Sequence, residues 1–186
     1  MGKNSNMQQS PETTEYSSDW QQQVFDTLKS FDVKHVVYVP DAGHAEAIRM
    51  SEQDPDVISV ALTTEEEGIG YLAGAWLGGE RGALLMQSSG VGNCINMLAL
   101  QSLTKFPLLM LVTMRGDLAE FNPWQIPMGQ AAEKALNLMG VLTWRADSAE
   151  DVGPLIQGAA TMAFDSDCAC AVLLGQRLIG RKEWLK

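Results

Sequence analysis

Several features that assign proteins to specialised classes are scarce in this sequence. No apolar run approaches the roughly 20 residues needed to cross a bilayer, and the first ten residues lack the apolar stretch of a secretory signal. Lys and Arg number 13 against 23 Asp and Glu, and the resulting formal net charge of -10 disfavours nucleic acid and anionic lipid. We therefore expect a cytoplasmic protein with no nucleic-acid partner and no membrane partner.

Cysteine is also scarce. Cys94, Cys168 and Cys170 are an odd number, and their spacing matches neither a disulfide framework nor a zinc knuckle. We interpret all three as small buried hydrophobic side chains in a reducing compartment, and no metal site is expected in this chain.

The remaining composition predicts one globular domain. A chain of 186 residues with 46% hydrophobic side chains can bury one core of ordinary size. Residues 1–16 are polar and carry no apolar periodicity, so they are predicted to be a disordered tail. Residues 17–186 are then the folded domain.

Helical and strand patterns alternate from Trp20 onward. Short apolar runs predict six strands, at 35–39, 57–62, 83–86, 107–113, 141–145 and 170–174, separated by helical segments that include 65–77 and 92–102. Such alternation predicts an α/β fold of three layers, with a six-stranded, mainly parallel sheet and helices on both faces. Ligands bind beyond the carboxyl ends of such strands, so functional residues are expected just after the first four.

Two glycine patterns superficially match a dinucleotide-binding turn. Before Gly68 and Gly70 stands the acidic triplet Glu65–Glu67, which would repel a pyrophosphate. The second pattern, Gly90 and Gly92, lacks the third glycine and an acidic residue about 20 positions further on. A nicotinamide or flavin site is therefore not favoured.

The triplet Glu65–Glu67 has two interpretations. Acidic residues in the first turn of a helix are favoured by the helix dipole and commonly stay solvated. The helix that follows, however, contains Gly68, Gly70 and Gly74, which destabilise a solvent-facing helix and make sense under close packing. At least one of the three carboxylates is then expected at a buried junction.

Taken in order, these motifs resemble a known family. Thr64-Glu65, then Ala73-Gly74-Ala75, then Gln87–Asn93 (QSSGVGN) are similar to the pyrimidine-binding domain of thiamine diphosphate enzymes, above all to sulfopyruvate and phosphonopyruvate decarboxylases. The resemblance runs from about Trp20 to Leu174. It implies the thiamine diphosphate-binding fold and thiamine diphosphate as the cofactor.

The resemblance also implies roles for single residues on the cofactor side. The family's catalytic glutamate hydrogen-bonds N1′ of the aminopyrimidine and so promotes removal of the thiazolium C2 proton; its spacing to Gly74 selects Glu65. Gly90, Gly92 and Asn93 correspond to a turn where backbone approaches the cofactor ring, although an ordinary strand-to-helix turn would have the same pattern.

The loop that follows the first strand is expected to line the site as well. Pro40 and Asp41 would contact the cofactor, with Asp41 as a candidate second acid, and His44 would relay a proton to the carbanion left after carbon dioxide departs. A solvated or capping histidine fits the same pattern.

Three further residues are expected to face the substrate. Gln87 and Ser88 follow the third strand, and Arg115 follows the fourth, where its guanidinium could pair with a sulfonate or phosphonate. Arg115 could equally be a surface residue paired with Asp117 or Glu120.

A second half of the active site is missing from this sequence. Full-length enzymes of the family carry a Gly-Asp-Gly motif and a downstream Asn that hold Mg²⁺ and the diphosphate, and no such motif occurs here. In two-chain sulfopyruvate decarboxylases a beta subunit supplies it, and this chain resembles the alpha subunit. The resemblance thus implies a hetero-oligomer, active only with its beta subunit, that converts a small anionic 2-oxoacid, 3-sulfopyruvate, to sulfoacetaldehyde and carbon dioxide. Phosphonopyruvate or another 2-oxoacid, or a non-catalytic binding module of the same fold, are the alternatives.

Overall fold

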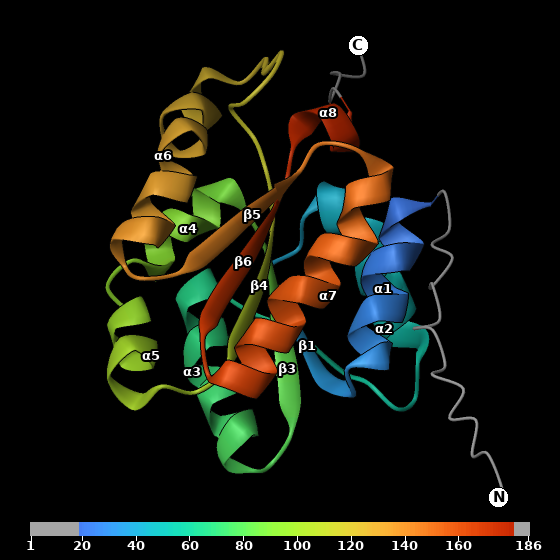
Figure 1. Ribbon diagram of the computed structural model, residues 1–186. Coiled ribbons are helices and arrows are strands. Elements are labelled where there is room, and N and C mark those ends of the chain that lie inside the picture. Colours follow the sequence, from blue (N-terminus) through green and yellow to red (C-terminus); the bar gives the residue numbers. More distant parts are fainter. Residues whose placement is uncertain (1–18, 181–186) are drawn as a thin grey trace, which may run out of the picture.

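A computed structural model describes residues 19–180, and a single six-stranded sheet forms their centre (Figure 1). The strands are β1 (Val33–Tyr38), β2 (Ile58–Ala61), β3 (Arg81–Gln87), β4 (Leu108–Thr113), β5 (Leu142–Ala146) and β6 (Ala169–Leu174). They are all parallel, in the order β2-β1-β3-β4-β6-β5. The prediction of a six-stranded parallel sheet is confirmed.

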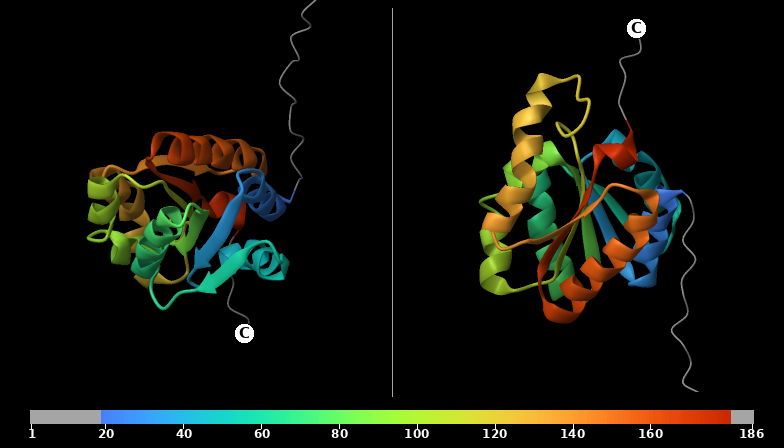
Figure 2. Two further views of the ribbon diagram at one scale, coloured as in Figure 1. Left: turned by 90° about the horizontal axis from the view of Figure 1, so that it is seen from below. Right: turned by 45° about the horizontal axis from the view of Figure 1, so that its top comes forward.

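Helices cover both faces of the sheet, which Figure 2 shows enclosed between them. One face carries α1 (Trp20–Ser30), α2 (Ala45–Gln53) and α7 (Ala149–Ser166). The other carries α3 (Glu65–Leu77), α4 (Ser88–Cys94), α5 (Leu98–Thr104) and α6 (Ile126–Leu138). Each layer packs its apolar side against its own core, and β4 and β6 are buried at every position because both faces are covered.

Successive strands lie on opposite sides of β1, which creates a switch point beside it. From β1 the chain runs to β2 on one side and then returns to β3 on the other. The segments leaving β1 and β3 therefore diverge, and a crevice opens at their carboxyl ends. Two short 3-10 turns, η1 (Ala42–His44) and η2 (Pro123–Gln125), and the four-residue helix α8 (Gln176–Ile179) also lie in loops that follow strands.

One expected helix was wrong, and one observed helix was not expected. A single helix was expected over 92–102 after a glycine turn, but Gly90, Gly92 and Asn93 lie inside helix α4, and α5 is a separate helix. Glycine has low helix propensity, and here packing of α4 against α3 and α6 overrides it. The small helix α8 was not expected at all.

A disordered tail and the lack of a membrane span were both expected. The predicted tail, residues 1–16, lies outside the described residues. Within residues 19–180, no helix combines the length and apolar character required to traverse a bilayer.

Candidate functional site

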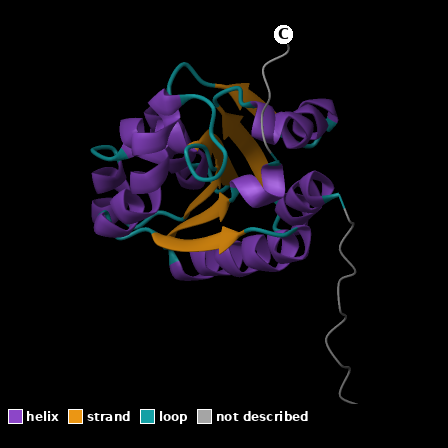
Figure 3. Cartoon of the chain, turned by 90° about the horizontal axis from the view of Figure 1, so that it is seen from above, coloured by secondary structure: helices purple, strands orange, loops and turns teal. Residues whose placement is uncertain are grey.

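The predicted functional residues lie at the carboxyl end of the sheet, which Figure 3 views from above. Several of them form two groups. One group contains Glu65 of α3, which is hydrogen-bonded to Asn93 of α4 and packed against Gly90 of the same helix. The other is centred on Asp41, which follows β1. Residues that are distant in sequence are thus adjacent because parallel strands end at one edge.

Glu65 is buried at the junction of α3 and α4. Its side chain begins α3 and is 7% exposed, whereas Glu66 is half-buried and Glu67 is exposed. The Nδ2 of Asn93 donates to Glu65 Oε2 over 2.7 Å. Of the acidic triplet, Glu65 is therefore the carboxylate that is both buried and hydrogen-bonded at this junction. Oε2 of the half-buried Glu66 is also buried, without a hydrogen-bond partner among residues 19–180, whereas Glu67 accepts from the backbone of Thr63 as a helix-start residue.

Gly90 makes room for that carboxylate. A Cβ at this position would lie 2.3 Å from Cδ and 2.4 Å from Oε1 of Glu65, well inside van der Waals contact. The absence of a side chain at Gly90 is therefore required by Glu65 itself. The expected cofactor contact of Gly90 and Gly92 stays a prediction; Gly92 and Asn93 are exposed next to Glu65.

The geometry around Glu65 fits an aminopyrimidine ring. Within residues 19–180, Asn93 is hydrogen-bonded to Oε2 and nothing is hydrogen-bonded to Oε1. One carboxylate oxygen can thus accept a hydrogen bond from a ring nitrogen while the other holds the side chain in place. The neighbouring thiol of Cys94 is fully buried, and burial together with the carboxylates of Glu65 and Glu66 raises its pKa to about 12. Cys94 is therefore protonated and is no competing nucleophile.

Asp41 is the centre of the second group. Its carboxylate accepts hydrogen bonds from the backbone N–H of Gly43 (3.1 Å), from Nε2 of Gln87 (2.9 Å) and from Oγ1 of Thr113 (2.5 Å). These donors come from the loop after β1 and from the ends of β3 and β4, so Asp41 ties three strands together across the switch point. Gln87 in turn accepts from Ser89 Oγ over 2.9 Å.

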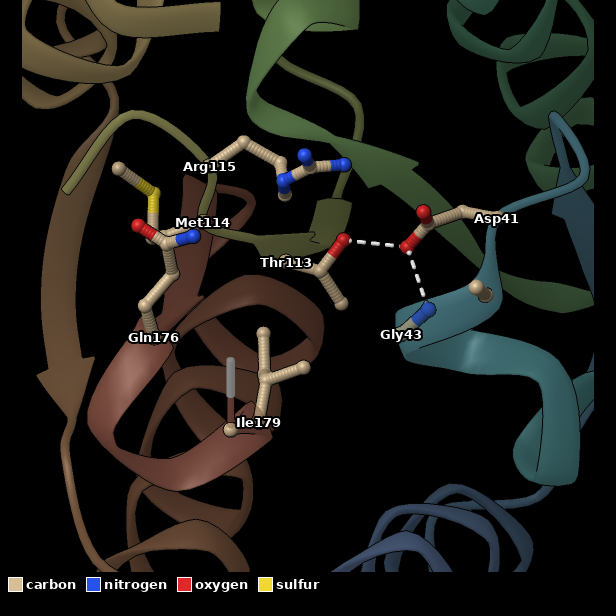
Figure 4. A pocket seen from close by; sticks show the side chains of 9 residues that line it. Asp41, Gly43, Thr113, Met114, Arg115, Gln176 and Ile179 are labelled. Carbon is tan, nitrogen blue, oxygen red and sulfur yellow. Dashed lines mark hydrogen bonds between the residues drawn. The ribbon is translucent and has the colours of Figure 1, made fainter. Parts of the chain in front are cut away.

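Asp41 borders a cavity of about 180 Å³ (Figure 4). Thr113, Arg115 and Gln176 line it as well, together with Ile179 of α8. Figure 4 shows Arg115 and Asp41 above this cavity, with Thr113 between them. The expected substrate-side residue Arg115 and the expected cofactor-side residue Asp41 are thus neighbours in one hollow.

Arg115 is paired with Glu120 inside the protein. Its Nε and Nη2 donate to the two oxygens of Glu120 over 2.7 and 2.6 Å, and the two side chains are 13% and 2% exposed. The pairing with Arg115 lowers the pKa of Glu120 to about 2. The alternative interpretation was a surface arginine paired with Asp117 or Glu120. It is right about Glu120, but the Arg115 side chain is only 13% exposed and Asp117 pairs with Arg145.

The Ser88 side chain makes a contact within the protein and does not face open space. It is fully buried, and its Oγ accepts from the backbone N–H of Arg115 over 3.0 Å. It therefore fixes the start of the loop after β4. The expected roles of Gln87, Ser88 and Arg115 toward substrate stay predictions.

His44 and Pro40 lie on different sides of the loop after β1. His44 is 0% exposed, and its Nε2 lies 3.1 Å from the carbonyl of Leu111. The interpretation of a solvated histidine is thus wrong, because η1 places the ring against β4; a proton relay through His44 stays a prediction. Pro40 is exposed and lines a second, open hollow of about 420 Å³ with Tyr38 and Glu52.

Sequence patterns did not single out Gln176 or Thr113, and Glu120 was expected only as a possible partner of Arg115. Thr113 ends β4 and Gln176 follows β6, so the strand-end rule pointed to both. Of the cysteines, Cys94 and Cys170 are buried as expected, whereas Cys168 is only partly buried and precedes β6. No cluster of His, Cys, Asp and Glu able to hold a metal ion occurs within 19–180.

Comparison with known protein families identifies the family of this chain. Residues 19–119 match the model of the thiamine pyrophosphate enzyme N-terminal TPP binding domain. The chain belongs to this family. The matched segment contains Glu65, Gly90, Asn93, Asp41 and Arg115, so it covers both hydrogen-bonded groups.

Relatives of this TPP-binding domain are named as decarboxylases or as decarboxylase subunits. The alpha subunit of sulfopyruvate decarboxylase from Methanocaldococcus jannaschii is 35% identical over 151 residues, which cover 81% of this chain and 89% of that protein. The same subunit of Methanococcus maripaludis is 36% identical over 152 residues, which cover 81% of this chain and 91% of that protein. Phosphonopyruvate decarboxylase of Streptomyces viridochromogenes is 33% identical over 113 residues, 60% of this chain and 28% of that protein.

A solved structure agrees on the fold. The 2-oxoglutarate:ferredoxin oxidoreductase from Magnetococcus marinus superposes with a TM-score of 0.71 over 86% of this chain and 29% of that one. Sequence identity is 13%, so the likeness concerns the fold alone.

Proposed function

We propose that this chain is the alpha subunit of a thiamine diphosphate-dependent 2-oxoacid decarboxylase, with 3-sulfopyruvate as substrate and sulfoacetaldehyde and carbon dioxide as products. One observation carries the proposal: the carboxylate of Glu65 is buried, held by Asn93, and accommodated by a glycine at 90. The relatives that match most of the chain are named sulfopyruvate decarboxylase subunit alpha, which supports the same reaction.

The role of Glu65 is to hold a proton at a ring nitrogen. The bound cofactor supplies an acidic carbon and an electron sink for decarboxylation. Glu65 Oε1 would hydrogen-bond the aminopyrimidine, and Asn93 would keep the carboxylate pointing at it. Gly92 and the exposed part of Asn93 would lie beside the ring plane. Because the side chain is buried, this hydrogen bond forms in a water-poor environment and is correspondingly strong.

A partner chain is needed for the rest of the cofactor. The sequence has no Gly-Asp-Gly motif, and we propose that a beta subunit holds Mg²⁺ and the diphosphate. Support comes from the surface of α3 beyond Glu65. A Cβ added at Gly74 would meet no atom within 4 Å, and Trp76 and Leu77 are 40% and 81% exposed. Small and apolar residues on an exposed helix are explained if another chain packs there.

The charges around the cavity favour a singly charged substrate tail. Among the described residues that line the cavity, Arg115 is the one cation, and the carboxylates of Glu120 and Asp41 lie beside it. A sulfonate carries one negative charge, whereas a phosphonate carries close to two near neutral pH and is repelled more strongly. We therefore expect 3-sulfopyruvate to be used more efficiently than phosphonopyruvate.

The test replaces the carboxylate alone. The chain is co-purified with its beta subunit, and carbon dioxide release from 3-sulfopyruvate and phosphonopyruvate is measured with thiamine diphosphate and Mg²⁺. Glu65→Gln keeps the size of the side chain and an acceptor for Asn93, so assembly should be unchanged while kcat falls at least ~100-fold, the range for loss of one acid–base group.

A matched variant controls for charge in the same helical turn. Glu67→Gln removes an exposed carboxylate two residues away and should leave kcat within about twofold. Full activity of pure Glu65→Gln would contradict the assignment of Glu65. An assembled wild-type complex that releases no carbon dioxide from any 2-oxoacid would favour the non-catalytic binding module instead.

A further inference from the structure

Gln176 connects the end of β6 to the loop that carries Arg115. It is the first residue of α8 and is 6% exposed. Its Oε1 accepts from the backbone N–H groups of Asp117 and Leu118, both over 2.7 Å. A single side chain thus satisfies two consecutive backbone donors of the loop after β4, which fixes the path of that loop.

The other end of the same amide reaches Glu120. Gln176 Nε2 donates to Glu120 Oε2 over 3.1 Å. Glu120 also accepts from the backbone of Gly116 and Asn122, over 3.1 and 3.0 Å, in addition to its pair with Arg115. Its carboxylate is therefore held from three directions before Arg115 is considered, so it acts as a rigid support for the guanidinium.

The support leaves one edge of Arg115 open. Nε and Nη2 are used by Glu120, and Nη1 has no hydrogen-bond acceptor within residues 19–180. Arg115 and Gln176 both line the cavity of about 180 Å³; in Figure 4 Gln176 lies across from Gly43, and Arg115 lies above, near Asp41. The ring of Phe121 lies 5.6 Å from the guanidinium carbon and limits its movement further.

We propose that Gln176 is a positioning residue that, through Glu120, orients Arg115 so that its open edge binds the anionic tail of the substrate. This inference rests on the proposed function, because it needs a 2-oxoacid with a second anionic group. Gln176 and Glu120 need not touch substrate themselves. Their contribution is to prevent Arg115 from sampling other rotamers, which lowers the entropic cost of binding the tail.

The test separates tail binding from the rest of the reaction. In the complete complex, Gln176→Glu keeps the acceptor for the two backbone N–H groups but places a carboxylate against Glu120. We expect KM for 3-sulfopyruvate to rise roughly tenfold, with kcat changed less than about twofold, as for loss of one charge-assisted hydrogen bond in binding. Gln176→Ala, which adds no charge, should raise KM in the same direction.

A double-mutant cycle decides whether the effect passes through Arg115. Once Arg115→Ala has removed the guanidinium, adding Gln176→Glu should change KM less than about twofold, because the two effects are coupled. Gln22→Glu is the matched control: it also replaces an amide that donates to a carboxylate, Asp26 (2.8 Å), but in an exposed hydrogen bond on α1. KM should be unchanged in this variant.

Each result has one interpretation. An equal KM change for Gln176→Glu with and without Arg115, or a loss confined to kcat, would overturn the inference. Normal kinetics of Arg115→Ala in an active complex would overturn it as well, while the proposed function would stand. A wild-type complex that decarboxylates no 2-oxoacid would overturn both.

Discussion

At the scale of single residues, Gly90 and Glu65 compete for the same space. A methyl group at 90 would lie 2.3–2.4 Å from three atoms of the Glu65 side chain. Glycine-to-alanine changes inside helices usually stabilise by about 0.5–1 kcal/mol. Here we expect Gly90→Ala to destabilise by about 1–3 kcal/mol, as overpacking does, and to reduce decarboxylation by displacing the carboxylate. Thermal unfolding and kcat of the assembled complex measure the two effects.

A second glycine provides the comparison. Gly158 lies in helix α7, is exposed, and has no atom within 4 Å of a Cβ built on it. Gly158→Ala should therefore follow the general rule and raise the unfolding temperature slightly, with activity unchanged. If Gly90→Ala also raised stability and kept full activity, close packing of Glu65 against residue 90 would be disproved.

Sequence alone predicted some of these residues well and others poorly. Glu65 was selected from three adjacent carboxylates, and the structure buries that one. The burial of His44 was not predictable, because it depends on Leu111 of a strand 67 residues away. Pairing of Arg115 with Glu120 was one of two local options, and sequence spacing does not distinguish them. Contacts between residues far apart in the sequence, such as that of His44 with Leu111, could therefore not be predicted from the sequence.

At the scale of elements, local patterns predicted helices and strands where burial is periodic. Helix α3 was expected over 65–77 and spans Glu65–Leu77. Helix α4 was misjudged because its glycines serve packing, and α8 was missed because four residues show no periodicity. Both failures lie at the site, where the missing side chain of Gly90 and the amide of Gln176 serve contacts with other elements rather than local propensity.

The turn η1 provides a pH-dependent element. Burial lowers the pKa of His44 below its usual value of 6.5, although the nearby charge of Asp41 opposes the shift. A histidine with a lowered folded-state pKa contributes stability that is present above the unfolded pKa and is lost as pH falls below it. We therefore expect η1 to loosen as the pH falls below about 6.5.

The measurement compares wild type with His44→Gln, whose amide can still donate to Leu111. Urea unfolding of the assembled complex at pH 7.5 and pH 5.5 gives the difference in unfolding free energy at each pH. The advantage of wild type should shrink at the lower pH, because the variant has no group that titrates at this position. An unchanged difference would show that His44 does not titrate on unfolding.

At the scale of the whole molecule, the chain presents half of a site. Glu65 is buried, yet Gly92 and Asn93 beside it are exposed, and the outer part of α3 is apolar and exposed. Enclosure of the place beside the carboxylate, where the proposed cofactor ring would lie, is thus incomplete in one chain. A partner that covers α3 and α4 would complete it, which connects the proposed subunit contact with the activity of Glu65.

Gly74 tests this connection at the surface. It lies on α3, and a Cβ added there would meet no atom within 4 Å, so a larger side chain fits the isolated chain without a clash. If the beta subunit packs against α3, Gly74→Leu should lower the yield of co-purified complex at least roughly tenfold, since overpacking an interface costs about as much as overpacking a core. Gly158→Leu, on the opposite face of the sheet and equally open, should leave the yield unchanged. Equal yields from both variants would place the partner elsewhere on the molecule, and enclosure of Glu65 would then have to come from the far side of α4.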